Sequence, residues 1–197
     1  MGKPRQEMIA ETRAKLLAAG RHAFGTIGYA EASMDDFTGE AGLTRGALYH
    51  HFGDKKGLLQ AVITEIDAEM TARLNKVSAE APTRWQGFVD ECVAYIQMAL
   101  EPEIQRIMFR DGPAVLGDIS QWPITNGCIA ALSHSLGQLK ADGEVIDIDV
   151  EAAARLINGA SSHAASWIAN SDRPEETSRK AVEGFRALLE GLRIKRD

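Results

Sequence analysis

The stretch GLTRGALYHHFGDKK, residues 42–56, places an arginine, a tyrosine and two adjacent histidines on one short helical segment, followed by two lysines. An arginine at a helix tip reaches base edges in a DNA groove, and hydroxyl, imidazole and ammonium groups bind backbone phosphates. Small residues beside the arginine keep the tip slim enough to approach the groove floor. These residue types predict a DNA-binding surface made by Thr44, Arg45, Gly46, Ala47, Tyr49, His50 and Lys55.

Two short helices joined by a glycine turn are expected to position these side chains. A capping-box pattern at Ser33 starts a helix over 34–41, which Gly42 ends. Thr44 caps the second helix, over 45–51. This order is typical of a helix-turn-helix unit, whose second helix enters the DNA major groove.

Apolar residues recur at helical spacing along the rest of the chain, and strand alternation is absent. The sequence therefore predicts an all-α fold, with a three-helix DNA-binding head and a larger helical domain. We expect the head to span 1–54 and the second domain 55–197. Helices are expected at about 6–24, from 54 onward, and at 83–100, 102–110, 120–141, 149–170 and 174–193, with a connector at DGPAVLGD, residues 111–118.

The net charge of −6 is unevenly distributed. Residues 1–56 hold eight Lys and Arg against seven Asp and Glu, so the acidic excess lies in the remainder. A near-neutral head binds phosphate when its cations converge on one face. The acidic remainder is either a solvated surface or a feature suited to a cationic ligand.

Several classes of site and location are not expected. No stretch reaches the roughly 18 apolar residues of a membrane helix, and no signal-peptide core follows the N-terminus, so we expect a cytoplasmic protein. The two cysteines lack CxxC spacing, and neither a metal site nor a cofactor is expected. A helical enzyme or ligand carrier that binds no operator is the alternative, although no set of nucleophile, base and orienting group is evident.

The segment FGTIGYAEASMDDFTGEAGLTRGALYHHFGDKKGLLQAV is similar to the DNA-binding head of TetR-family transcriptional regulators, over about residues 8–63. The resemblance implies a homodimer that binds double-stranded operator DNA, with a repressor role as the expectation. It adds Ser33 to the expected DNA contacts. It also implies a helical regulatory domain that dimerises and binds a small-molecule effector, for which we expect a hydrophobic or aromatic compound. Two departures are Phe37, in place of a smaller aliphatic residue, and Gly39 inside a helix.

The last two expected helices carry apolar stripes that either pair two chains or close the core of one chain. The spacing alone does not choose between these interpretations. The resemblance favours an interface, because these regulators pair through their two C-terminal helices. The expected interface residues are Ile157, Ala160, Ala164, Phe185, Leu189 and Leu192.

Large apolar and amphipathic residues on the middle helices are candidates for a ligand pocket. Each of them is also compatible with ordinary core packing. Cys92 and Cys128 are in addition either redox sensors or inert buried thiols. The candidate ligand-binding residues are Phe88, Cys92, Tyr95, Met108, Trp122, Cys128 and Trp167.

Overall fold

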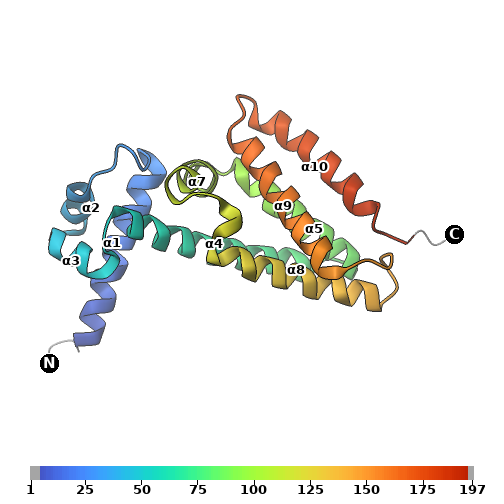
Figure 1. The fold of residues 1–197 in the computed structure, drawn as a ribbon. Helices are drawn as coiled ribbons and strands as arrows, with labels where there is room; N and C mark the ends of the chain where they lie inside the picture. The colour runs from blue at the N-terminus through green and yellow to red at the C-terminus, as the bar shows by residue number, and fades with distance from the viewer. Residues whose placement is uncertain (1–4, 195–197) are drawn as a thin grey trace. The chain divides into compact units, whose positions relative to one another are not determined.

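The computed structural model describes residues 5–194, and its regular elements are helices apart from one isolated bridge between Val145 and Arg193 (Figure 1). The predicted all-α class is confirmed. None of the described helices is both long and apolar enough to cross a membrane.

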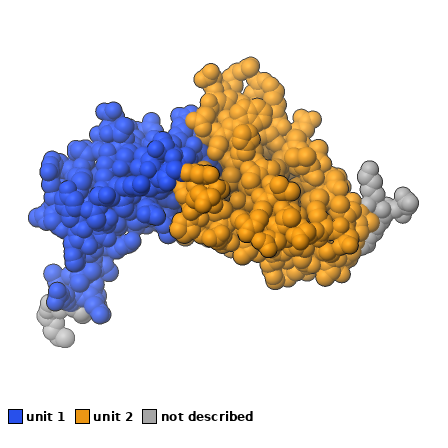
Figure 2. Space-filling view, viewed as in Figure 1, with its two compact units in different colours: residues 1–66, 102–117 blue, residues 67–101, 118–197 orange. Residues whose placement is uncertain are grey.

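The chain forms two compact units, coloured separately in Figure 2. Unit 1 contains the described residues through Ile66 together with Pro102–Gly117, and unit 2 contains Asp67–Glu101 and the described residues from Asp118 onward. Unit 1 is thus larger than the expected head at 1–54. The functional boundary between residues 54 and 55 stays a prediction, because compactness does not assign function.

Unit 1 is built around aromatic packing. Phe24 and Phe37 are fully buried, and their rings meet edge to face with centroids 5.2 Å apart. Phe37, the larger residue that departs from the family pattern, therefore anchors the second helix to the first. The first helices are α1 (Arg5–Thr26), α2 (Met34–Ala41), α3 (Arg45–Phe52) and the start of α4 (Lys55–Glu80).

The turn between α2 and α3 follows from local chemistry. Ser33 and Asp36 form the predicted capping box, and α2 has the predicted bounds. Gly42 ends α2 with φ at +64°, a left-handed conformation that glycine adopts without steric cost. The helix-turn-helix unit is therefore specified by residues close together in sequence.

Residues 102–116 stay helical, as α6 (Pro102–Arg106), a π-helix η2 (Ile107–Asp111) and α7 (Gly112–Leu116). The connector expected at 111–118 is therefore wrong over most of its length. Pro113 lies in the first turn of α7, directly after the π-helix, and proline lacks the N–H of a regular helical hydrogen bond.

Long-range polar contacts tie this segment to α1. The Arg21 guanidinium pairs with Glu103 at 2.8 Å and with Glu65 at 3.0 Å. Asp111 accepts a hydrogen bond of 2.8 Å from the backbone N–H of Tyr29, and Arg106 donates to the Thr26 carbonyl. These contacts explain why the segment belongs to unit 1.

Unit 2 is a packed group of helices, with α9 against α8, α5 and α10. Pro123 begins α8 three residues later than predicted, because Trp122 has an extended backbone and proline suits the first helical position. The remainder of α4 is joined there by α5 (Arg84–Gln97), η1 (Met98–Leu100), η3 (Ile119–Gln121), α8 (Pro123–Ala141), α9 (Val150–Ala169) and α10 (Pro174–Glu190).

Candidate functional site

Helix α3 presents a polar face to solvent. Leu48 is fully buried and fixes the opposite face of the helix to the core of unit 1. Arg45, Tyr49 and His50 are exposed, and 54% of the Tyr49 surface is accessible. Gly46 is also exposed, and a Cβ there would meet only the Thr44 hydroxyl within 4 Å. The tip of α3 is therefore slim and open, while Ala47 is half-buried beside it.

Arg45 is paired with a carboxylate of the preceding helix. Its guanidinium donates two hydrogen bonds to the Asp35 carboxylate at the start of α2, and both side chains are exposed. This pair holds the pKa of Asp35 below its usual range and raises the pKa of Arg45. Asp35 thus fixes the position of the guanidinium at the tip of α3.

Two predicted contact residues are also helix caps. The Ser33 hydroxyl accepts a hydrogen bond of 3.2 Å from the Asp36 N–H, and the Thr44 hydroxyl accepts one of 3.3 Å from the Ala47 N–H. Both caps are exposed. Their hydroxyl protons are not used by these bonds, so they are free to donate to phosphate.

Lys55 lies at the start of α4. Its ammonium is 4.3 Å from the centroid of the Tyr29 ring and 3.5 Å from the Ala30 carbonyl oxygen. Asp54 caps this helix, accepting a hydrogen bond of 2.7 Å from the Gly57 N–H. The lysine is half-exposed and is oriented by the tyrosine face.

The end of α3 is only partly buried. Phe52 is half-exposed, and the Arg13 guanidinium lies 5.1 Å from its ring centroid. His51 is half-exposed too, and burial, then the neighbouring His50 and Arg13, lower its pKa. Arg13 therefore covers the aromatic ring and adds a cation near the histidines.

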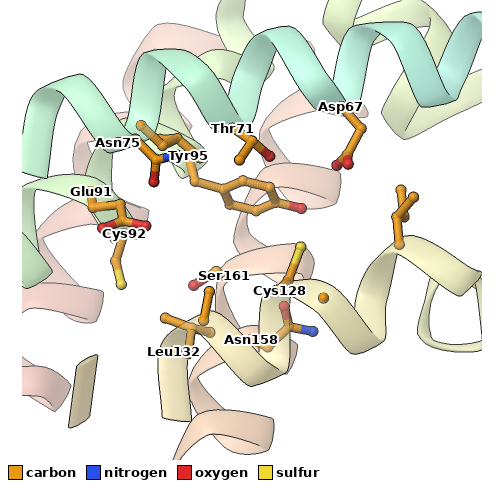
Figure 3. Close-up of a pocket in the computed structure, with 14 residues that line it drawn as sticks. Asp67, Thr71, Asn75, Glu91, Cys92, Tyr95, Cys128, Leu132, Asn158 and Ser161 are labelled. Atoms are coloured by element: carbon orange, nitrogen blue, oxygen red, sulfur yellow. The ribbon is translucent and has the colours of Figure 1, made fainter. Parts of the chain in front are cut away.

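Unit 2 contains a cavity of about 310 Å³, shown in Figure 3. Its walls come from α4, α5, α8 and α9, where lining residues recur every three or four positions on one face of each helix. The lining residues are Asp67, Thr71, Leu74, Asn75, Glu91, Cys92, Tyr95, Ile124, Gly127, Cys128, Ala131, Leu132, Asn158 and Ser161.

Three of the seven predicted pocket residues line this cavity: Cys92, Tyr95 and Cys128. Phe88 and Trp122 are 2% and 7% exposed and belong to the core. These two match the alternative of ordinary packing.

The other two candidates lie elsewhere. Met108 is buried in the π-helix of unit 1, and Trp167 is 50% exposed on α9. Neither lines the cavity, because periodicity identifies an apolar face without identifying what it packs against.

The surroundings of both cysteines disfavour the thiolate form. Burial raises the pKa of Cys92 to about 12, and burial with nearby carboxylates raises the pKa of Cys128. A redox-sensing cysteine needs the opposite shift, because the thiolate is the reactive form. This environment supports inert cavity-lining thiols.

Sequence reasoning missed the polar lining of the cavity. Asp67, Thr71 and Asn75 follow one another at intervals of four on α4, and Glu91 lies one turn before Tyr95 on α5. Polar residues at this spacing form a stripe on one helix face. That stripe was the signal available in the sequence, but it resembles an ordinary solvated face.

The predicted interface residues lie mostly in the core of unit 2. Ile157 and Ala164 are each 7% exposed, Phe185 is 4% and Leu189 is 1% exposed. These four side chains pack within unit 2, and their place in a dimer interface stays a prediction. Ala160 and Leu192 are half-buried.

A different apolar surface is exposed on the same two helices. On α9, Leu156 is 74% and Trp167 is 50% exposed, and a separation of 11 residues places them on one face, about three turns apart. On α10, Leu188 is 68% exposed. We call Leu156, Trp167 and Leu188 the exposed apolar set.

Comparison with known proteins assigns both parts of the chain. The family described as "Bacterial regulatory proteins, tetR family" matches residues 16–62, and the "Tetracyclin repressor-like, C-terminal domain" matches residues 85–192. The second match alone covers more than half of the chain. The chain belongs to the TetR family of transcriptional regulators.

Individual TetR-family relatives agree along the whole chain. A crystal structure of a TetR-family transcriptional regulator from Pectobacterium atrosepticum is 47% identical, with a TM-score of 0.90, and covers 99% of this chain and 100% of its own. The transposon Tn10 TetC protein of Escherichia coli is 28% identical, covering 96% of each chain. The transcriptional regulator UidR of E. coli strain K12 is 27% identical, covering 92% of each.

This membership confirms two expectations from the sequence. The TetR-family chain is a DNA-binding transcriptional regulator of the helix-turn-helix type, and it is not an enzyme. The exposed face of α3 lies within residues 16–62, the part of the chain that this DNA-binding family matches.

Proposed function

We propose that this protein is a homodimeric repressor that leaves its operator when a small molecule occupies the cavity of unit 2. The observation that carries the proposal is the exposed tip and face of α3, with Arg45, Tyr49 and His50 all accessible. Such a repressor acts in the cytoplasm, where bacterial DNA lies.

The residues of the head divide by role. Arg45 reads a base after leaving Asp35, because a guanidinium donates two parallel hydrogen bonds to a guanine edge. Tyr49, His50 and Lys55 bind phosphates that flank the groove. Ser33 and Thr44 donate hydroxyl hydrogen bonds to phosphate from the helix starts, and Gly46 and Ala47 allow close approach.

The exposed apolar set forms the contact between two copies. Large apolar side chains exposed together on one surface are typical of protein interfaces. Gly159 and Gly184 lie on the same two helices, and a Cβ at either would meet nothing within 4 Å, so these positions leave room for close helix approach. Two heads held by such a contact read half-sites about 34–36 Å apart.

Regulation requires that the ligand bind the DNA-free arrangement more tightly than the DNA-bound one. Helix α4 is continuous from Lys55 at the DNA surface to Asp67, Thr71 and Asn75 in the cavity wall. Ligand binding against that wall therefore acts on the element that also carries a phosphate contact. By linkage, ligand and operator weaken each other by the same factor.

The test measures binding of the protein to DNA upstream of its own gene, by fluorescence anisotropy over a range of salt concentrations. Lys55→Ala should weaken binding to all sequences and lower the salt slope by about 1. Arg45→Ala should cost about 1–3 kcal/mol and relax preference at one base position. Lys76→Ala is the control, since Lys76 is an exposed lysine on α4 outside the head.

Two results would contradict the proposed reading head. One is an affinity of the Lys55 and Arg45 variants equal to that of the Lys76 control. The other is the absence of any salt-dependent preference for the upstream DNA, which would favour a ligand-binding protein without an operator.

A further inference from the structure

The cavity of unit 2 has an acidic lining. Asp67 on α4 and Glu91 on α5 both face it, and in Figure 3 they stand on either side of the Tyr95 ring. All lining residues lie in the described part of the chain, and none of them is Lys, Arg or His. The lining therefore has two acidic side chains and no basic one.

The two carboxylates are only partly compensated by the protein. Burial raises the pKa of Asp67, and no charge or hydrogen bond from the described residues offsets that effect. Burial also raises the pKa of Glu91, and a hydrogen bond with the Ser78 side chain opposes the rise only in part. Desolvated carboxylates without a cationic partner favour a positive group brought by a ligand.

Both carboxylates are close enough to the same cavity residue to affect its pKa. The negative charges of Asp67 and Glu91 both raise the pKa of Cys128, which projects from α8 into the cavity. Asp67 also raises the pKa of Tyr95, which burial and its neighbours together bring to about 12. A single small ligand in this cavity is therefore close to both acids.

The α8 part of the cavity wall is apolar, while α9 adds the polar Asn158 and Ser161. Helix α8 contributes Ile124, Gly127, Cys128, Ala131 and Leu132, whereas α4 contributes Asp67, Thr71 and Asn75 together with Leu74. In Figure 3 the α4 side chains extend toward those of α8 and α9, with the Tyr95 ring between them. A tyrosine face attracts a cation, and an aliphatic wall buries an apolar body.

We infer that the cavity binds an organic cation, with an amine or quaternary ammonium group between Asp67 and Glu91 and a compact apolar body against α8. The inference rests on the proposed function in one respect, that this cavity is the regulatory site. It adds a positive charge to the hydrophobic or aromatic effector expected from the sequence.

Other charge classes fit the lining less well. An anionic ligand would meet two like charges and no basic side chain among the lining residues. A neutral ligand would leave the desolvated carboxylates without a counter-charge. The cavity volume of about 310 Å³ suits a molecule with a single ring.

The experiment uses probes of similar shape that differ in charge: benzyltrimethylammonium as the cation, neopentylbenzene as its neutral isostere, and phenylacetate as the anion. Binding to the full-length protein is measured by titration calorimetry, with thermal shift as a second readout. We expect the cation to bind at least about tenfold more tightly than either other probe.

Neutral isosteres of the acids test the assigned residues. Asp67→Asn with Glu91→Gln should remove the preference for the cation while leaving binding of neopentylbenzene unchanged or stronger. Glu80→Gln, compared with each single variant, is the control, because it removes one carboxylate from an exposed position on α4 outside the cavity lining. Circular dichroism of each variant establishes that it is folded.

The outcomes separate this inference from the proposed function. Unchanged cation affinity in the double variant, equal or tighter binding of the neutral or anionic probe, or no binding of any probe at millimolar concentration would overturn the inference. Operator release is measured separately by anisotropy. A cation that binds through Asp67 and Glu91 without changing operator affinity supports the ligand class and contradicts the regulatory role of the cavity.

Discussion

Replacement of Leu188 by alanine should weaken the dimer more than any change to the buried residues next to it. Leu188 is 68% exposed on α10, whereas its neighbour Leu189 is 1% exposed. Burial of a leucine side chain contributes about 1.5–3 kcal/mol. About two-thirds of that free energy, or about 1–2 kcal/mol, is gained when a second copy buries the exposed part of the side chain.

Symmetry doubles this contribution. In a two-fold interface each residue occurs twice, so Leu188→Ala removes about 2–4 kcal/mol from the dimer. Since about 1.4 kcal/mol corresponds to tenfold, the dimer dissociation constant should rise about 30- to 1,000-fold. The free energy of unfolding of the monomer should change little, because the side chain makes few contacts within it.

Sedimentation velocity over a concentration series measures the dissociation constant directly. Ile27→Ala is the control, since Ile27 is 51% exposed and belongs to unit 1, whereas the exposed apolar set belongs to unit 2. If Leu188→Ala and Ile27→Ala give the same dissociation constant as the unchanged protein, the contact does not lie on this face of α10.

Four further predictions concern single residues. Asp35→Asn should free Arg45 and remove a negative charge near the groove, so binding to scrambled DNA should tighten and preference for the operator should fall, as measured by anisotropy on both duplexes. Gly57→Ala should lower the unfolding free energy by about 1–3 kcal/mol in urea titrations, because its Cβ would lie 1.9 Å from the backbone carbonyl oxygen five residues earlier. Gly39→Ala should instead raise the unfolding free energy by about 0.5–1 kcal/mol, because Gly39 is helical and a Cβ there would meet nothing within 4 Å. Burial raises the pKa of Asp67, so its contribution to stability is present at acidic pH and lost as pH rises through that pKa. Asp67→Asn should therefore raise the melting temperature at neutral pH, and a gain that persists unchanged in acid would contradict this cause.

The sequence by itself determined the helix-turn-helix unit. The bounds of α2 and the caps at Ser33 and Thr44 follow from contacts between residues three or four apart, which any chain with this local sequence makes. Gly42 ends α2 for an equally local reason, its left-handed backbone. The DNA-binding expectation was therefore accessible without the fold.

Tertiary structure decided which apolar stripe is buried. The stripes of α9 and α10 have the same spacing whether they meet another helix of the same chain or a second copy. Only the packing of α9 against α5, α8 and α10 shows that Phe185 and Leu189 point inward and Leu188 outward.

The cavity of unit 2 was likewise decided by contacts between distant parts of the sequence. Asp67 and Glu91 lie 24 positions apart, and each by itself resembles a charge on a solvated helix face. A helical pattern specifies the face on which a side chain lies, but not the neighbour that faces it. The acidic character of the cavity therefore emerges only when α4 and α5 are packed against α8 and α9.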